Sequence, residues 1–495
     1  MSNMNRRDFI KYSGAGLASL TMAVHFPFLA TRKAFATVSG NSFTIAVISD
    51  TQNYSDFTYP QPASINNFIA QTQYLASNMN DMKLAFVTHV GDVVQHGDGT
   101  NGVAGNSSYG AGAEWENAME ALNILSASGL PFGVVPGNHD YDNYSYSSGS
   151  RPLVSNVMWK KYLGSSSPYF AGKPWYGGAS DQLAYNSGLS SYQTFCAGGK
   201  KFLHISLEME PGNNALAWAQ GVINSHLGYA TIVTTHSYLS PPADSDSNPP
   251  YVVPATINTA GYLNNSPAGW NNLVTVWNNF ISQNAQIFMV LCGHSWGATD
   301  ANGVSKGENI RVDNNTAGNP VYQILSDYQG NTTAGSKGGD GWFRFMEFDM
   351  GTNSIHCYTY STLLSEKAGQ NGETTFREDP LFSDFSLVMP PQVLNATPQF
   401  NVVTSGLTYN RMTKLFNANL IVTNDGTNFV GTLGVALNNL TAGVTLSNAV
   451  GQYSGAPYVT VTTTGLAAGA SASTLVQFSN PSNALINFTP VAFQE

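Results

Sequence analysis

The segment KLAFVTHVGD, residues 83–92, is an apolar run rich in β-branched side chains that ends in a Gly-Asp pair. A run of this length and composition is typical of a β-strand buried on both faces. Five further runs of the same kind lie between residues 37 and 300, and each ends in a polar residue or a turn: FTIAVISD (43–50), FGVVPGNHD (132–140), KFLHISLE (201–208), TIVTTHS (231–237) and AQIFMVLCGH (285–294). The chain is therefore expected to contain six buried strands.

Helical patterns separate several of these runs, at residues 64–80, 113–127, 214–226 and 269–285. Alternation of strand and helix is typical of an α/β layered fold. In such a fold the loops that leave the carboxyl ends of the strands form the binding site. Two long segments without these patterns, 141–193 and 240–254, are expected to form rims over that site.

The first 36 residues have the features of an export signal. NRRDFIK (5–11) is followed by a modestly apolar stretch, and TRKAFA (31–36) carries two alanines at the spacing of an A-x-A cleavage site. The segment resembles a bacterial twin-arginine signal peptide, with Arg6 and Arg7 as the pair, which implies export of the folded protein to the periplasm or the medium. An uncleaved membrane anchor is the alternative, but the apolar stretch is short and is interrupted by glycine and proline. We expect no stable membrane insertion after processing.

The composition limits the classes of partner. Charged residues make up 10% of the chain, and a surface this poor in charge suits an exported protein. The formal net charge is -10 and no basic run is present, which argues against binding of nucleic acid. The three cysteines cannot all pair within one chain, so we expect at most one disulfide.

The composition changes near residue 390. From Pro391 to Glu495 there is no histidine or cysteine, and short alternating runs are separated by Gly, Asn and Pro: NANLIVTN (417–424), GTLGVALNNL (431–440), PYVTVTT (457–463) and STLVQF (473–478). This pattern predicts a small immunoglobulin-like β-sandwich. Because it lacks the groups that acid–base or metal chemistry needs, we expect it to stabilise the protein or to dock it to the cell envelope or a protein partner. The expected domains are 1–36, 37–389 and 390–495.

The ends of the predicted strands carry side chains that can bind metal ions. A glycine at position 91, 137 or 293 lies beside a polar residue, where it lets the chain turn so that the side chain points into a common cavity. A single Gly-Asp or Gly-His pair is commonplace, but an ordered set after successive strands is specific. The set contains Asp50, Gln52, Asp92, Asn138, His139, Asp140, His236 and His294.

This set resembles the calcineurin-like metallophosphoesterase superfamily, which includes the purple acid phosphatases, and the resemblance covers residues 43–390. It implies two β-sheets packed face to face with helices outside, in four layers. It also implies two divalent metal ions, Mn, Fe or Zn, bridged by one carboxylate, and hydrolysis of a phosphate monoester or diester by a metal-activated water.

The resemblance also assigns roles to single residues. Asp92 would bridge the two ions, and one site would be completed by Asn138, His236 and His294. Asp50 and Gln52 would belong to the other site. His139 would protonate the leaving oxygen or stabilise the transition state, and Asp140 would orient or charge His139 or serve as a plain turn residue.

The expected chemistry follows from the charges. Two divalent cations about 3.5 to 4 Å apart can hold a phosphate oxygen and acidify a bridging water into a nucleophile. Asp50 and Asp92 supply two negative charges against four positive ones, so a loaded site attracts phosphate although the whole chain is acidic.

Two positions depart from the family pattern, in which histidines would stand at Gln52 and Trp296, and both fall on the same metal ion. An amide oxygen can ligate a metal, whereas an indole has only an N–H donor. Three oxygen ligands favour Mn²⁺ or Mg²⁺, so this second ion should bind more weakly than the ion at His236 and His294. The alternatives are a replacement ligand such as Asp300 or Glu308, or a protein that holds one metal or none and acts only by binding.

Overall fold

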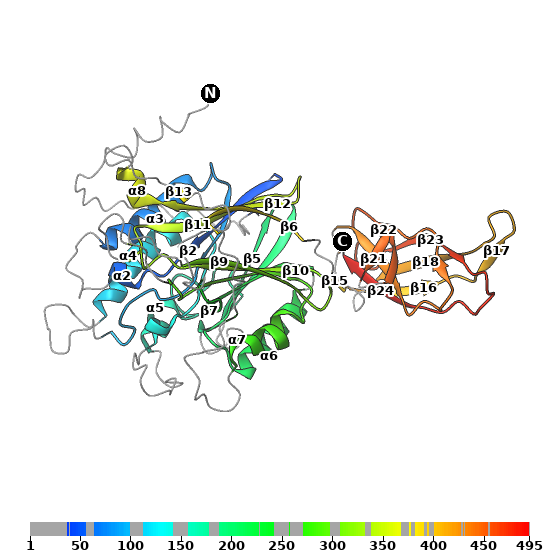
Figure 1. Ribbon diagram of the computed structural model, residues 1–495, viewed down its shortest axis with the longest axis horizontal. Coiled ribbons are helices and arrows are strands. Elements are labelled where there is room, and N and C mark those ends of the chain that lie inside the picture. Colours follow the sequence, from blue (N-terminus) through cyan, green and yellow to red (C-terminus); the bar gives the residue numbers. More distant parts are fainter. Residues whose placement is uncertain are drawn as a thin grey trace, which may run out of the picture.

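The computed structural model consists of an α/β body followed by a smaller all-β body (Figure 1). No helix among the described residues is long and apolar enough to span a membrane. The structure describes residues 37–38, 40–55, 64–99, 112–141, 157–177, 188–226, 228–241, 257, 271–297, 307–331, 338–367, 376–377, 382–390, 394–395, 400–426, 429, 431–453 and 456–494. The expected signal peptide and Asp300 lie outside these ranges.

The first sheet of the α/β body is mixed. Its strand order is β13 (Phe376–Arg377), β12 (Ser354–Ser361), β11 (Trp342–Asp349), β2 (Ser42–Ile48), β3 (Leu84–His89) and β4 (Phe132–Val134), with β14 (Asp384–Val388) paired to β12. β2, β3 and β4 run parallel, so their carboxyl ends lie at one edge of the sheet.

The second sheet is also mixed. Its strand order is β1 (Thr37–Val38), β5 (Ser191–Ala197), β6 (Lys200–Ser206), β7 (Ala230–Ser237), β8 (Ile287–Gly293), β10 (Pro320–Ser326) and β9 (Glu308–Asn314). The strands from β6 to β10 in this order are parallel, and β9 is antiparallel to β10.

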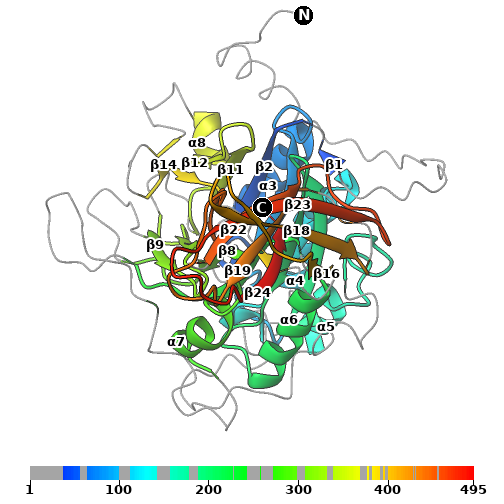
Figure 2. The ribbon, with the colours of Figure 1, turned by 90° about the vertical axis from the view of Figure 1, so that its right-hand side faces the viewer.

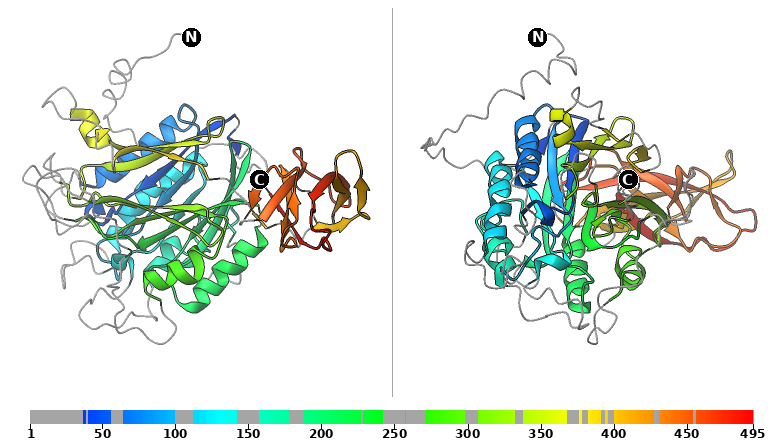
Figure 3. Two further views of the ribbon diagram at one scale, coloured as in Figure 1. Left: turned by 45° about the vertical axis from the view of Figure 1, so that its right-hand side comes forward. Right: turned by 60° about the vertical axis from the view of Figure 1, so that its left-hand side comes forward.

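The two sheets pack face to face because alternate strand residues are apolar on each side. Phe43, Ile45 and Val47 of β2 contact the second sheet in one core, while Ala46 and Ile48 face the helices in another. Helices cover both outer faces (Figure 3). The helices are α2 (Gln52–Ser55), α3 (Ser64–Asn78), α4 (Ala113–Ser128), η1 (Asn138–Asp140), α5 (Val157–Leu163), α6 (Asn213–Ser225), α7 (Leu273–Val276), η4 (Trp277–Ile281) and α8 (Thr362–Lys367).

The second body is a sandwich of two antiparallel sheets, in front of the α/β body in Figure 2. One sheet has the order β15 (Leu394–Asn395), β24 (Thr489–Gln494), β19 (Leu433–Asn438), β22 (Ala456–Thr462) and β21 (Gly451–Tyr453). The other has the order β16 (Phe400–Thr404), β18 (Leu415–Asn424), β23 (Ser471–Ser479) and β20 (Thr445–Leu446), with β17 (Thr408–Asn410) paired to β18. Inward-facing residues such as Leu420 and Val435 form the core between them.

The expected fold class is confirmed, with four layers in the first body and a β-sandwich in the second. All six predicted strands are present, as β2, β3, β4, β6, β7 and β8. β10 was not among them, although it runs parallel to β8 and ends at the same edge. The three cysteines are free thiols.

Candidate metal centre

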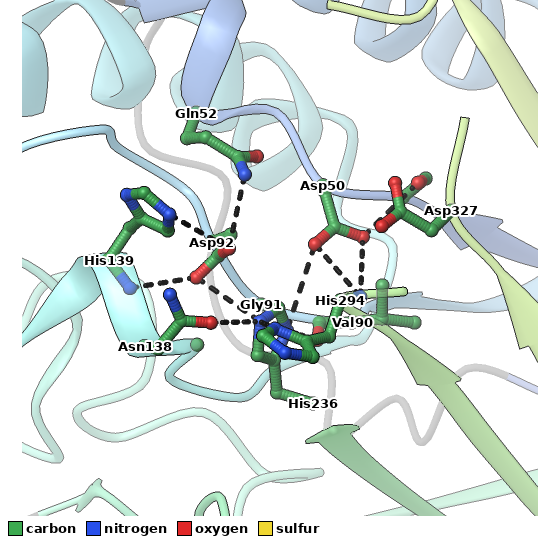
Figure 4. A network of polar contacts seen from close by, with 12 residues as sticks. Asp50, Gln52, Val90, Gly91, Asp92, Asn138, His139, His236, His294 and Asp327 are labelled. Atoms are coloured by element: carbon green, nitrogen blue, oxygen red, sulfur yellow. Dashed lines mark hydrogen bonds and ion pairs between the residues drawn. The ribbon is translucent and has the colours of Figure 1, made fainter. Parts of the chain in front are cut away.

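The parallel strands place the predicted ligands together at the carboxyl edges of the two sheets (Figure 4). Asp50 and Asp92 follow β2 and β3, and Asn138 begins η1 after β4. From the second sheet, His236 lies near the end of β7 and His294 follows β8. The site therefore lies between the two sheets, on loops held by strands.

Four donor atoms converge on one point. His236 Nε2 lies 3.0 Å from Asn138 Oδ1, 3.2 Å from Asp92 Oδ1 and 3.1 Å from His294 Nδ1. Ligand atoms about 2.1 Å from one cation lie about 3.0 to 3.5 Å apart when they subtend angles of 90° to 109°. Three donor atoms thus lie at this spacing from His236 Nε2, and the donor atoms of Asp92, His236 and His294 all lie within 4.8 Å of one another.

Hydrogen bonding orients the His236 ring. Its Nδ1 lies 2.8 Å from the Val90 carbonyl oxygen, so Nδ1 carries the proton and Nε2 faces the other donors. Burial alone would lower the pKa of His236, but the carboxylates of Asp92 and Asp50 outweigh it and raise the pKa to about 10. The environment of Nε2 therefore strongly favours a positive charge there, which a metal ion would supply.

Further oxygens lie beside this group, on Asp50 and Gln52. Asp50 accepts the backbone N–H of His294 at 3.1 Å, and Gln52 Nε2 donates to Asp92 Oδ2 at 3.1 Å. Gln52 is 1% exposed, yet its Oε1 has no hydrogen-bond partner among the described residues. Such a buried, unsatisfied acceptor is costly unless a water molecule or a cation binds it. The Gln52 oxygen, with the carboxylates of Asp50 and Asp92 in its surroundings, is thus a candidate donor for a cation.

Asp327, which the sequence analysis missed, lies beside Asp50 on the side away from Asp92 (Figure 4). It follows β10 and is fully buried. Burial raises the pKa of Asp50 well above its usual range, and Asp327 raises it further; burial likewise raises the pKa of Asp327 to about 7. The signal that could have found Asp327 is the segment LSDYQ (325–329), which matches ISDTQ (48–52) at three positions.

The backbone at the site is strained. Asp92 and His294 have φ angles of 54° and 73°, in the left-handed region that side chains other than glycine seldom adopt. Such strain clusters at functional sites, where the surrounding structure enforces it. Gly91, immediately before Asp92, has a φ of 105°, so it provides the turn that was expected of it.

Gly137 and Gly293 have a different role from the expected one. Neither has a positive φ. A Cβ on Gly137 would lie 2.1 Å from Asp92 Oδ1, and a Cβ on Gly293 would lie 2.3 Å from Asp50 Oδ2. Glycine is needed at these two positions because the backbone passes close to the two carboxylates and leaves no room for a Cβ atom. The backbone dihedral angles themselves do not require glycine.

His139 lies at the edge of the centre. Its backbone N–H donates to Asp92 Oδ1 at 2.9 Å, and its Nδ1 donates to the Gln95 carbonyl oxygen at 3.1 Å. Its Nε2, 3.9 Å from Asp92 Oδ2, is thereby directed toward the metal centre. The side chain is 15% exposed, so a substrate can reach it. This geometry suits a group that exchanges a proton with a substrate.

Asp140 joins two loops of the site. Its carboxylate is fully buried and accepts backbone N–H groups of Val93 and Val94 at 2.8 and 3.1 Å and of Gly137 at 2.8 Å. Burial raises the pKa of Asp140 to about 8, against the effect of these bonds. The bonds go to the backbone on either side of the centre, so Asp140 holds the loop of Asp92 against the loop of Asn138.

Further groups outside the predicted set support the same loops. Glu114, fully buried at the start of α4, accepts the backbone N–H groups of Gln95 and His96 at 3.1 and 2.9 Å. It thereby fixes the segment whose carbonyl binds His139. His89 contacts Thr51 Oγ1 at 3.0 Å and accepts the Gly91 N–H at 3.1 Å, so it supports the loop that carries Asp92.

The expected replacement ligand Glu308 is contradicted by the structure. Its carboxylate binds Arg344 at 2.8 Å and also accepts hydroxyl groups of Tyr328, Thr359 and Ser383. Both charges are buried, so this ion pair occupies Glu308 completely. Trp296 is 45% exposed at the end of the loop after His294. Asp300 lies outside the described residues.

Comparison with known proteins agrees with this geometry. The model of the calcineurin-like phosphoesterase family matches residues 43–295, which include every predicted ligand and end one residue before Trp296. The uncharacterized protein YvnB of Bacillus subtilis (strain 168) is 26% identical over 354 residues. That alignment covers 71% of this chain and 22% of YvnB, so the chain spans about a fifth of that relative's length. With about half of its length matched and the ligand set assembled at the strand ends, the chain belongs to the calcineurin-like phosphoesterase family.

Proposed function

We propose that this protein is an exported hydrolase of phosphate monoesters or diesters that uses two divalent metal ions. The observation that carries the proposal is the pair of donor groups around Asp92: four converging N and O donors on one side and the unsatisfied Gln52 Oε1 with Asp50 on the other. A single-metal binding protein would have no use for this second group.

Each residue has a defined task in this proposal. Two bound cations would polarise a phosphate oxygen and supply a nucleophilic hydroxide at neutral pH. Asp92 presents one oxygen to each side of the centre, since Oδ1 faces His236 and Oδ2 faces Gln52. His139 holds a proton at Nε2 for the leaving oxygen, with its ring fixed through Nδ1.

The donor types also indicate the metals. The site with two imidazoles suits Zn²⁺, Fe or Mn²⁺, whereas the all-oxygen group of Asp50, Gln52 and Asp92 suits Mn²⁺ or Mg²⁺. The second ion is expected to bind more weakly, because Trp296 supplies no nitrogen ligand.

Export and docking belong to the same proposal. The twin-arginine-like segment around Arg6 and Arg7 supports a periplasmic or secreted location. The C-terminal sandwich, with only four charged residues beyond Pro391, supports a docking or stabilising role rather than a chemical one. Replacement of both arginines by lysine should retain the precursor in the cytoplasm, and processed protein in the periplasm of that variant would contradict export by this route.

The activity is tested with p-nitrophenyl phosphate and bis(p-nitrophenyl) phosphate, using protein loaded with Mn²⁺, Zn²⁺ or Fe²⁺. We expect metal-dependent turnover of at least one ester and its loss in Asp92→Asn. Asp349→Asn, an exposed carboxylate at the end of β11, is the matched control and should retain full activity. Protein that binds metal but hydrolyses neither ester would support the binding-protein alternative.

A further inference from the structure

Two Ser-Asp-x-Gln segments, 49–52 and 326–329, lie side by side although 277 residues separate them. One follows β2 in the first sheet and the other follows β10 in the second. Gln52 Nε2 donates to Gln329 Oε1 at 2.6 Å, and the Tyr328 backbone N–H donates to Ser49 Oγ at 3.2 Å. The two sheets are thus joined at the metal centre through the same short motif.

Hydrogen bonds orient the side-chain amides of both glutamines. Asp327 accepts both the backbone N–H and the Nε2 of Gln329, each at 3.0 Å. Since the amide nitrogen of Gln329 faces Asp327, its oxygen faces Gln52 and accepts from Gln52 Nε2. The second acceptor of Gln52 Nε2 is Asp92.

This chain of bonds determines which end of the Gln52 amide faces the centre. Both neighbours of the Gln52 nitrogen are acceptors, so a reversed amide would place an oxygen against two oxygens. The Gln52 oxygen is consequently turned toward the Asp50 side, where it has no hydrogen-bond partner among the described residues (Figure 4).

We propose that Asp327 and Gln329 are positioning residues that hold the amide oxygen of Gln52 toward the second metal ion, and that they thereby compensate for the histidine that Trp296 replaces. The proposal rests on the two-metal function proposed above. An amide is a ligand only through its oxygen, so fixing its orientation removes the ordering cost that a freely rotating glutamine would carry into metal binding. Groups that orient a ligand in this way commonly change metal affinity by about 10- to 100-fold.

The test is titration of the metal-free protein with Mn²⁺, followed by calorimetry and by electron paramagnetic resonance of the free ion. Gln329→Met keeps the side-chain length but removes the hydrogen bonds of the Gln329 amide to Gln52, Asn53 and Asp327. We expect the second Mn²⁺ to bind at least about 10-fold more weakly, with the first site changed by less than about twofold. Gln323→Met is the matched control, because Gln323 is a fully buried glutamine on β10 that binds Asp313 and should leave both sites unchanged. Gln329→Leu carries the same expectation should Gln329→Met not fold.

A double variant distinguishes orientation of the Gln52 amide by Gln329 from a general structural effect of Gln329 on the site. Both terminal atoms of a glutamate side chain at position 52 are oxygens. Glutamate therefore needs no relay, that is, no series of hydrogen bonds from Asp327 through Gln329, to present an oxygen to the metal ion. In protein carrying Gln52→Glu, Gln329→Met should therefore change the second Mn²⁺ affinity by less than about twofold. If Gln329→Met weakens the second Mn²⁺ site equally with Gln52 and with Glu at position 52, or does not weaken it with Gln52, the relay is overturned but the two-metal function is not. Native protein that binds no second Mn²⁺ would overturn both the relay and the two-metal function.

Discussion

His139 donates its backbone N–H to Asp92 at 2.9 Å, while its imidazole Nε2 remains 3.9 Å from the same carboxylate. The main chain of His139 therefore supports the Asp92 carboxylate, while its ring, held through Nδ1 by the Gln95 carbonyl, directs Nε2 toward the centre. These two tasks can be separated by mutation, because a change of side chain leaves the backbone bond in place.

His139→Ala should accordingly keep the metal stoichiometry and lower kcat by about 10²- to 10⁴-fold on esters with poor leaving groups. The loss should be smaller on p-nitrophenyl esters, whose leaving group departs without a proton. Steady-state kinetics on an alkyl and a p-nitrophenyl phosphate, together with metal analysis, checks this. Equal losses on both substrates would point to a different role for the ring.

The two metal sites should differ in affinity. Titration of the native metal-free protein should show one tight equivalent and one weak equivalent, with activity following the second. Trp296→His should tighten the second by supplying a nitrogen ligand. Binding of two metal equivalents with equal affinity by the native protein would contradict this prediction.

Glu308 should matter for stability and not for metal binding. Glu308→Gln leaves the Arg344 guanidinium buried without its counter-charge, so the free energy of unfolding should fall by about 3 to 5 kcal/mol. Metal content below the unfolding temperature should stay unchanged. Glu347→Gln on β11 is a suitable control, because the Glu347 side chain is 50% exposed. Chemical denaturation and metal analysis decide the matter, and loss of one metal ion in Glu308→Gln would restore Glu308 as a ligand.

Because of the buried His204, the free energy of unfolding should decrease when the pH is lowered. Its Nδ1 lies 2.7 Å from Gln193 Oε1 and its Nε2 2.8 Å from Thr234 Oγ1, and burial lowers its pKa to about 3. The unfolded chain titrates this histidine near pH 6.5, so between about pH 6.5 and 3 the unfolded state alone takes up the proton. The free energy of unfolding should therefore decrease as pH falls through this window, by up to about 1.4 kcal/mol per pH unit.

His204→Gln should reduce that slope. Urea denaturation at pH 7 and pH 4.5, with a chelator present to exclude metal-linked protons, measures it for both proteins. An unchanged slope in the variant would mean that other groups carry the pH dependence.

Removal of the C-terminal sandwich should leave the chemistry intact, but the truncation must keep Met389. Met389 is 4% exposed, packs in the core between the sheets and donates its N–H to the Asn353 carbonyl at 2.7 Å. A chain that ends after Pro390 should retain metal content and kcat, whereas one that ends at Val388 should be less stable. Loss of metal from a folded protein ending at Pro390 would assign the sandwich a part in the site.

Much of the centre could be predicted because each ligand follows directly on a buried strand. Asp50, Asp92 and His294 follow runs whose side chains are mostly apolar or small, and parallel strands bring such ends to one edge. The expected metal donors therefore meet in the structure. The reason given for Gly137 and Gly293 was wrong, because close approach of two loops is a tertiary property that the local sequence does not reveal.

The roles of Asp327 and Glu308 were not predicted from the sequence. The run before Asp327 is interrupted by Gln323, and no glycine stands beside the carboxylate, so the strand signal is weaker than in the other runs. Glu308 was considered as an alternative ligand because the sequence shows only its carboxylate. Its counter-charge, Arg344, comes from β11 in the other sheet, and only the folded chain brings the two together.

The hydrogen bond from the His294 main chain to Asp50 links the two halves of the centre. In the proposed two-metal centre, His294 would offer its ring to one cation, and Asp50 would offer its carboxylate to the other. An ion that fixes the His294 ring also fixes the N–H that holds Asp50, so part of the ordering needed for the second ion is complete before it arrives. Filling of the histidine-rich position should thus increase affinity at the oxygen position, and thermodynamic linkage requires the same factor in the reverse direction. The pair of ions would in this sense be a cooperative unit, whose coupling would pass through the backbone of one residue.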